Sequence, residues 1–303
     1  MKIILFGGSG FLGSHLIQKL AATGHEVILV TRRPNSLVDT VPASVSVKSW
    51  FPLEGLSSII NGSDAVVNLI GESIGAKRWS PARKQEILSS RVDTTRSVVN
   101  AIGRTTRKPS VLLNASAVGY YGNVPDGEIV ETHPSGNDFL ADVCARWEAE
   151  ALKVEQFGVR VVMPRSGLVL SDDGGALPRM LLPFRLFAGG TLGSGKQWVP
   201  WIHIDDEVNA MIYALGNSEI SGPINSTAPE AVTMKQFCAA IGKAMHRPSW
   251  APVPAFVLRT ILGEMADALV LGGQKAVPTR LLESGFEFKY RKVEEALRSI
   301  LRG

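Results

Sequence analysis

The stretch that decides the fold opens the chain and reads Lys2-Ile-Ile-Leu-Phe-Gly-Gly-Ser-Gly-Phe-Leu-Gly13. A short apolar run that ends at glycine is typical of a buried parallel strand. After the glycines, apolar residues recur at helical spacing as far as Gly24, and residues 25–30 form a second apolar run. A strand, a glycine-rich turn, a helix and a second strand predict the first βαβ unit of a dinucleotide-binding domain.

The glycine-rich turn suits the phosphates of a dinucleotide. Gly7 permits a tight turn, Gly10 lets the backbone approach the pyrophosphate, and Gly13 allows the helix to pack closely on the sheet. The amide groups at the helix start attract negative charge, which the helix dipole also favours. A turn with a purely structural role is the less favoured interpretation. The cofactor-binding residues predicted here are Gly7, Ser9, Gly10, Phe11, Leu12 and Gly13.

The end of the second strand indicates which dinucleotide is bound. NAD sites usually carry an Asp or Glu about 20 residues after the glycines, which binds the ribose 2′-hydroxyl. This chain has Thr31-Arg32-Arg33-Pro34 there. An arginine fork suits a 2′-phosphate, and its plane can stack on adenine. We therefore predict NADP(H) as the cofactor, with Arg32 as the phosphate ligand and Arg33 as a second candidate that could equally be a solvated loop residue.

Strands and helices continue to alternate along the chain. Apolar runs over 64–71, 111–117 and 159–163 predict buried strands, and the pattern over 81–103 predicts a long helix. This alternation predicts a doubly wound parallel Rossmann sheet of the α/β class, whose ligand lies beyond the carboxyl ends of the strands. The residues expected to contact the cofactor at that edge are Leu69, Ile70, Gly71 and Arg165.

The composition changes after residue 170, where loop-rich and glycine-rich segments begin. We expect residues 1–170 to form the NADP-binding domain, with 200–226 returning to it. Residues 171–199 and 227–303 are expected to form a smaller, partly interleaved C-terminal substrate cap. The cap includes an amphipathic helix expected over residues 289–301. Asp206 is expected to cap the helix that follows it.

Composition limits the classes of partner. Of the 303 residues, 45% are hydrophobic and 20% charged, which is ordinary for a globular protein. The net charge of +4 is spread along the chain, so we expect no nucleic-acid partner. Two cysteines without a Cys/His cluster predict a reducing compartment and no metal site. Without a cleavable signal or a bilayer-spanning run, we expect a cytoplasmic protein with a small-molecule substrate and no membrane partner; the sequence does not predict its oligomeric state.

Several motifs together resemble a known superfamily. The glycine turn, Ser116-Ala-Val-Gly-Tyr-Tyr-Gly122 and Trp201-Ile-His-Ile-Asp-Asp206 resemble the extended short-chain dehydrogenases/reductases, which include sugar-nucleotide epimerases. Asn68-Leu-Ile-Gly-Glu-Ser-Ile74 and Trp147-Glu148 are similar to its atypical "epimerase family protein" branch, which has a small C-terminal domain. The resemblance covers essentially the whole chain. It implies a Rossmann fold, a nicotinamide cofactor and a C-terminal cap, but it does not specify the reaction.

The catalytic motif of that superfamily is missing. Its members use a Ser or Thr with Tyr-x-x-x-Lys, where the lysine lowers the tyrosine pKa from about 10. The matching segment, 139–150, contains neither Tyr nor Lys, although Arg146 could replace the charge of the lysine. The catalytic candidates are therefore Ser116, Tyr120 and Tyr121. Equally, the tyrosines could be core or lid residues, and Ser116 could bond to backbone.

Polar residues near the strand ends are candidates for substrate binding. Glu72, Arg78 and Trp79 lie in the loop after the strand at 64–71, and Arg91 lies on the long helix. An arginine beside a tryptophan suits an anionic or planar ligand, with a surface stack as the alternative. We therefore expect an NADP(H)-dependent oxidoreductase or epimerase acting on a small polar carbonyl or alcohol. The alternative, favoured by the missing motif, is an NADP(H)-binding regulatory or scaffold protein without catalysis.

Overall fold

A computed structural model of the protein describes residues 1–37 and 40–301. Its main sheet is parallel throughout, in the order β12-β8-β5-β4-β1-β2-β3, with β6 also paired to β8. The order reverses direction beside β1, as in a doubly wound Rossmann sheet, so the predicted fold class is confirmed. The strands are β1 (Lys2–Phe6), β2 (Glu26–Thr31), β3 (Val45–Ser49), β4 (Ala65–Asn68), β5 (Val111–Asn114), β6 (Ser116–Ala117), β8 (Arg160–Ser166) and β12 (Gly222–Ser226).

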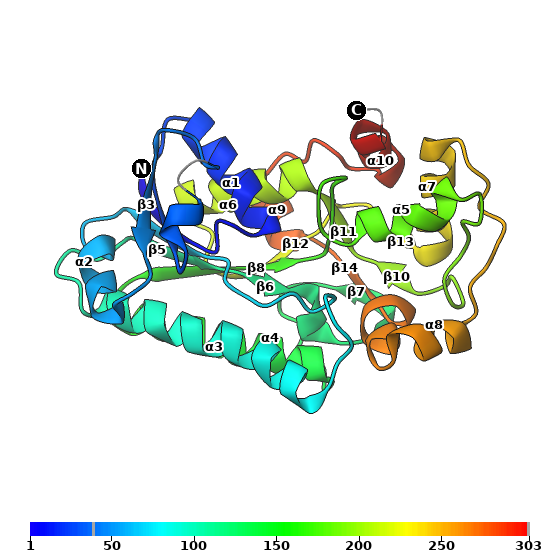
Figure 1. The fold of residues 1–303 in the computed structure, drawn as a ribbon, viewed down its shortest axis with the longest axis horizontal. Coiled ribbons are helices and arrows are strands. Elements are labelled where there is room, and N and C mark those ends of the chain that lie inside the picture. Colours follow the sequence, from blue (N-terminus) through cyan, green and yellow to red (C-terminus); the bar gives the residue numbers. More distant parts are fainter. Residues whose placement is uncertain (38–39, 302–303) are drawn as a thin grey trace.

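Helices cover both faces of this sheet (Figure 1). One face carries α1 (Phe11–Ala22) and α6 (Ile204–Gly216), and the other carries α2 (Leu56–Ile60), α3 (Pro81–Gly103) and α4 (Phe139–Leu152). Successive residues of β1 face opposite sides, so Leu5 packs with Leu16 of α1, whereas Phe6 packs with Ile102 of α3. Each such side chain contributes about 1.5–3 kcal/mol when it is fully buried. The continuous apolar run at the start of the chain is explained by burial on both faces.

Local signals set the helix boundaries. Helix α3 begins as predicted, with Pro81 at its first position and the Ser80 Oγ accepting a hydrogen bond from the Arg83 N–H at 3.2 Å. The prediction for Asp206 was wrong. Helix α6 is capped instead by His203, whose Nδ1 accepts from the Asp205 N–H at 3.0 Å. Burial lowers the pKa of His203 to about 4, so at neutral pH the ring is uncharged and has a nitrogen free to accept.

Asp206 instead anchors the C-terminal segment. Its two carboxylate oxygens accept hydrogen bonds from the backbone N–H groups of Lys289 and Tyr290, both at 2.8 Å. The last helix, α10 (Val293–Leu301), begins four residues later than predicted, after the two residues that Asp206 binds. The predicted strand over 111–117 is also interrupted, because β5 and β6 are separate strands.

Three short two-stranded sheets lie outside the main sheet. They pair β9 (Leu168–Leu170) with β11 (Trp201–His203), β10 (Trp198–Val199) with β13 (Val232–Thr233), and β7 (Val124–Ile129) with β14 (Gln274–Ala276). One of them, β7 with β14, joins the Rossmann part to the C-terminal segment. The remaining helices are α5 (Leu177–Arg185), α7 (Met234–Met245), α8 (Ala255–Leu262) and α9 (Thr279–Glu283).

Residues 171–199 and 227–303, called the cap below, contribute most of a separate hydrophobic cluster. Leu181 of α5, Phe237 of α7 and Leu297 of α10 pack together around Trp201. Helices α5, α7, α8 and α10 gather at one end of the molecule, opposite β2 and β3 (Figure 1). None of the helices within residues 1–37 and 40–301 is both long and apolar enough to cross a membrane.

Candidate functional site

The glycine turn is shaped by close backbone approach. Gly7 has φ of +82°, and a Cβ there would lie 2.7 Å from the carbonyl carbon of Leu69. A Cβ on Gly13 would lie 2.4 Å from the Gly7 oxygen. Both distances are shorter than real Cβ contacts, so only glycine fits at either position. The turn therefore lies directly on the Leu69-Ile70 segment that follows β4, and the predicted cofactor residues of the two segments are neighbours.

The start of α1 is open to an anion. Its N-cap is Gly10, and no described side chain caps the helix. A Cβ on Gly10 would meet only the Gly7 oxygen, at 3.3 Å. The first amides of a helix have no partner within the helix, so the amides at Phe11 and Leu12 are directed toward this open side. These features fit the pyrophosphate of a dinucleotide.

The ring of Phe11 points away from this opening, toward the loop after β9. It makes an edge contact with His15, with 5.6 Å between ring centroids, and lies where a side chain on Gly174 would clash. The same loop is joined to α1 by an ion pair between His15 and Asp173, with 3.1 Å between Nε2 and Oδ2. The backbone of Phe11 thus belongs to the helix start beside the glycine turn, whereas its ring packs against the loop after β9.

A polar hollow of about 460 Å³ adjoins the end of β2. Arg32 reaches it from the β2 end, whereas its other lining residues come from the loop after β4 and from α3. Arg33 is exposed and does not line the hollow. The lining residues are Arg32, Glu72, Lys77, Arg83, Glu86, Ser89, Ser90 and Asp93.

Arg91 lies beside the predicted cofactor segment. Its guanidinium carbon is 3.0 Å from the place where a Cβ on Gly71 would stand and 5.1 Å from the centroid of the Trp147 ring. Burial lowers the pKa of Arg91, and its one hydrogen bond among the described residues goes to the Ile87 carbonyl at 3.0 Å. The structure thus groups this predicted substrate ligand with Gly71.

The loop over residues 72–80, called the strap below, contains the other predicted substrate residues. Glu72 lines the polar hollow, where its Oε2 lies 3.4 Å from Nη1 of Arg83. Arg78 points the other way, with its Nη2 2.9 Å from the place of a Cβ on Gly263 in the cap. Trp79 stacks edge-on against Phe139 and donates to a carbonyl within the strap. These residues therefore do not converge on one point.

Beneath the strand ends lies a buried network around Arg165. Its Nε and Nη2 donate to the two carboxylate oxygens of Glu148 at 2.9 and 2.8 Å, and the Ser116 hydroxyl donates to the same carboxylate at 2.6 Å. Burial alone would lower the pKa of Arg165, but Glu148 outweighs it and raises that pKa. Most Arg165 donors thus bond to protein groups, and its contact with the cofactor stays a prediction.

The two tyrosines lie in different environments. Tyr121 is 1% exposed; its hydroxyl accepts from Arg165 at 2.9 Å and donates to Asn225 Oδ1 at 2.6 Å, while burial raises its pKa to about 12. Tyr120 is half-buried, and its ring centroid lies 3.5 Å from the guanidinium carbon of Arg165. Within residues 1–37 and 40–301, its hydroxyl has no hydrogen-bond partner. Of these two tyrosines, Tyr120 is therefore the one whose hydroxyl is available to a ligand.

Comparison with known proteins matches most of the chain to two family models. Residues 3–225 match the family model described as the NAD dependent epimerase/dehydratase family. The chain belongs to this family. Residues 253–300 match DUF1731, a domain of unknown function, so the resemblance drawn from the sequence is confirmed for both parts.

Named relatives cover the whole of this family member. The Arabidopsis thaliana "Epimerase family protein SDR39U1 homolog, chloroplastic" is 44% identical over 311 residues, spanning 100% of this chain and 87% of that protein. The Bacillus subtilis epimerase family protein YfhF is 41% identical over 307 residues, spanning 99% and 98%. The crystal structure of human epimerase family protein SDR39U1 (isoform 2) with NADPH superposes with a TM-score of 0.90 at 35% identity, covering 100% of both chains.

Helix α4 contributes two buried side chains, Cys144 and Glu148, that sequence reasoning did not place in the site. Cys144 and Glu148 have the spacing of Tyr-x-x-x-Lys, and Glu148 bonds to Ser116. Burial raises the pKa of Cys144 to about 12, which keeps its thiol protonated at neutral pH. The proposed substitute, Arg146, was wrong, because it is exposed and pairs with Asp142 at 2.9 Å. Glu148 belongs to the Trp147-Glu148 pair of the family resemblance, which was a signal for it in the sequence.

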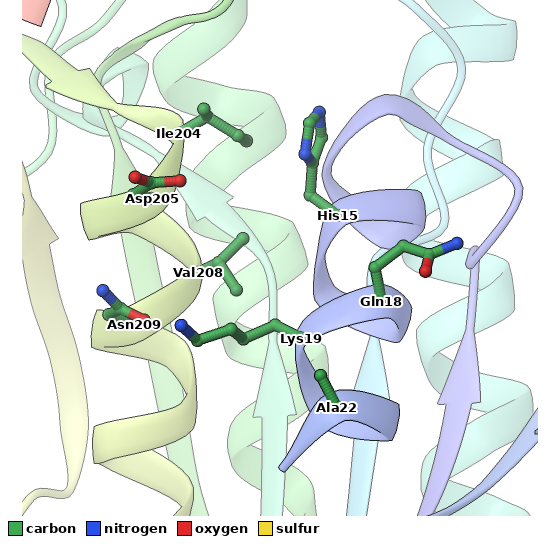
Figure 2. Close-up of a pocket in the computed structure, with 8 residues that line it drawn as sticks. All are labelled: His15, Gln18, Lys19, Ala22, Ile204, Asp205, Val208 and Asn209. Carbon is green, nitrogen blue, oxygen red and sulfur yellow. The ribbon is translucent and has the colours of Figure 1, made fainter. Parts of the chain in front are cut away.

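A second hollow of this epimerase-family chain, about 370 Å³, lies between α1 and α6. Figure 2 shows Lys19 and His15 of α1 facing Asp205 and Asn209 of α6. It occupies a helix-covered flank, whereas ligands of doubly wound sheets bind beyond the strand ends. We therefore do not place the cofactor there. In the described part of the chain, no group of three or more His, Cys, Asp or Glu side chains could bind a metal ion.

Proposed function

We propose that this protein binds NADP(H) and uses it as an oxidoreductase or epimerase on a small polar carbonyl or alcohol. The observation that carries the proposal is the position of Arg32 in the polar hollow, at the end of β2 and near the glycine turn. An arginine there fits a 2′-phosphate, whereas NAD sites carry a carboxylate. The NADPH in the human relative's crystal structure supports the same cofactor.

In the proposed reaction, the glycine turn and Arg32 would hold NADP(H), which would supply or accept the hydride when bound. For a carbonyl substrate, the Tyr120 hydroxyl donates a proton to the carbonyl oxygen as the alcohol forms, and water then reprotonates the phenol. Tyr120 is proposed because its hydroxyl is unpartnered, while that of Tyr121 is bonded to Arg165 and Asn225. Positioned acid–base groups typically contribute 10²–10⁴-fold to rate.

A second function, NADP(H)-binding regulation without catalysis, is favoured by one observation. Ser116 and Tyr121, two of the three candidate catalytic groups, bond to buried residues of the protein itself. A scaffold that binds cofactor without turnover would need only the glycine turn, Arg32 and a responsive surface. The two functions differ in whether NADPH is consumed.

The test is a titration of the purified protein with NADPH and NADH, followed by a screen of carbonyl substrates for NADPH oxidation. Preferential NADPH binding with turnover supports the enzyme, with Tyr120→Phe as the matched variant. Preferential binding without turnover across the screen favours the regulatory function. Failure to bind either dinucleotide would refute both.

A further inference from the structure

The negative charges of the polar hollow already have partners. The Glu86 and Glu72 carboxylates lie 2.7 and 3.4 Å from Nη1 of Arg83, and that of Asp93 lies 2.8 Å from Nη1 of Arg96. Arg83 is 8% exposed, and its Nε is the one buried side-chain polar atom without a hydrogen-bond partner in the described residues. Each acidic side chain that lines this hollow therefore has a cationic neighbour, although Glu72 and Glu86 share Arg83.

The remaining charges of the hollow are both positive. Arg32 and Lys77 line it, and neither forms an ion pair with any residue that the structure describes. Arg32 follows β2, whereas Lys77 belongs to the strap. A planar guanidinium and a compact ammonium together offer several charged donors to one anion. A phosphate monoester, which carries close to two negative charges at neutral pH, matches this pair better than a carboxylate does.

The strap that carries Lys77 is joined to the cap. The Gly75 carbonyl accepts from Nη1 of Arg179 on α5 at 2.7 Å, and Arg78 lies against Gly263 just after α8. A ligand that binds Lys77 would therefore contact the Rossmann part through Arg32 and the cap through the strap.

We propose that Lys77 is a second ligand, with Arg32, of the cofactor's 2′-phosphate, and that this phosphate fixes the strap against the cap. The inference rests on the proposed binding of NADP(H) and adds a specificity-determining residue that does not come from the end of β2. NAD(H), which lacks the phosphate, leaves Lys77 without its ligand. The choice between NADP(H) and NAD(H) thus affects how firmly the strap is held beside the cap.

The test compares 2′,5′-ADP with ADP as probes, measured by calorimetry on the full chain. For Lys77→Met we expect 2′,5′-ADP to bind at least about tenfold more weakly, the range of a charge-assisted hydrogen bond, with ADP binding unchanged. Lys77→Arg should retain most of the preference. Lys19→Met is the matched control, because Lys19 is a lysine on α1 outside the polar hollow, and should bind both probes like the wild type.

Hydrogen exchange of residues 72–80 provides the second readout. NADPH should protect these amides more than saturating NADH does, and Lys77→Met should remove the difference. Equal weakening of both probes, unchanged binding by Lys77→Met, or equal protection by both cofactors would each overturn the inference. If the wild type itself does not prefer 2′,5′-ADP to ADP, the proposed cofactor fails as well, so the two failures are distinguishable.

Discussion

The Ser116 hydroxyl donates a hydrogen bond to the buried carboxylate of Glu148, with 2.6 Å between Oγ and Oε1. The superfamily's motif has a lysine, whereas α4 (Phe139–Leu152) contains none. The positive charge comes instead from Arg165 on β8, which binds Glu148 through two donors. The cation lies beneath Tyr120, supplied by a different element of the fold.

Removing Glu148 should therefore destabilise the protein strongly. The Glu148→Ala variant leaves the Arg165 charge buried without its carboxylate, which typically costs 3–5 kcal/mol, on the order of half the stability of a domain. Glu150→Ala on the same helix is the control, because its partners Lys153 and Arg96 are about half exposed and its loss should cost about 1 kcal/mol or less. Urea unfolding measures both; equal losses would contradict the central role of the Glu148–Arg165 pair.

The two tyrosines should separate chemistry from stability. Tyr120→Phe should lower turnover by about 10²–10⁴-fold while leaving NADPH affinity and the melting temperature near wild type. Tyr121→Phe removes one buried hydrogen bond from Arg165 and leaves Asn225 Oδ1 without its donor, which should cost about 1–3 kcal/mol of stability. Stopped-flow oxidation of NADPH and thermal melts provide the readouts. Full turnover by Tyr120→Phe would remove the phenol from the mechanism.

Cofactor preference should follow Arg32. Arg32→Asp places a negative charge where the 2′-phosphate is expected, so the Kd for NADPH should rise by about 100-fold while that for NADH changes little. Arg33→Asp is the comparison, with a smaller loss expected because Arg33 does not line the hollow. Fluorescence titration measures both. An unchanged NADPH-to-NADH ratio in Arg32→Asp would show that another group binds the phosphate.

The sequence predicted those parts of the fold whose signals are local. The first βαβ unit was predictable from its glycines, because the backbone leaves no room for a side chain at Gly7 or Gly13. The start of α3 was predictable from the capping residue and proline of Ser80-Pro81. Strand β3 was not predicted, because Val45-Ser-Val-Lys-Ser49 is short and mostly polar. It becomes a strand by pairing with β2, which lies elsewhere in the sequence. Propensity cannot supply such a pairing.

The candidate site was less predictable because its contacts join distant segments. Ser116 meets Glu148, Tyr121 meets Asn225, and Arg32 and Lys77 come to line one hollow only once the chain is folded. Each residue type is common, and no spacing in the sequence links the pairs. The glycine turn and Arg32 were predictable because one βαβ unit contains both.

The protein should become less stable as pH rises from about 4.5 to about 7. Glu207 on α6 is fully buried, with both carboxylate oxygens accepting hydroxyl hydrogen bonds at 2.5 Å, from Ser166 and Ser226. Burial raises the pKa of Glu207 from 4.5 to about 7. The folded state therefore binds the proton more tightly than the unfolded state does. This stabilisation is fully present below pH 4.5 and is lost as pH rises through 7, a change on the order of 3 kcal/mol.

Glu207→Gln mimics the neutral acid, with an oxygen to accept from one serine and an amide to donate to the other, so its unfolding free energy should fall less over this range. Urea unfolding of both proteins from pH 5 to pH 8 measures the difference. Parallel pH profiles would show that Glu207 does not titrate in this window.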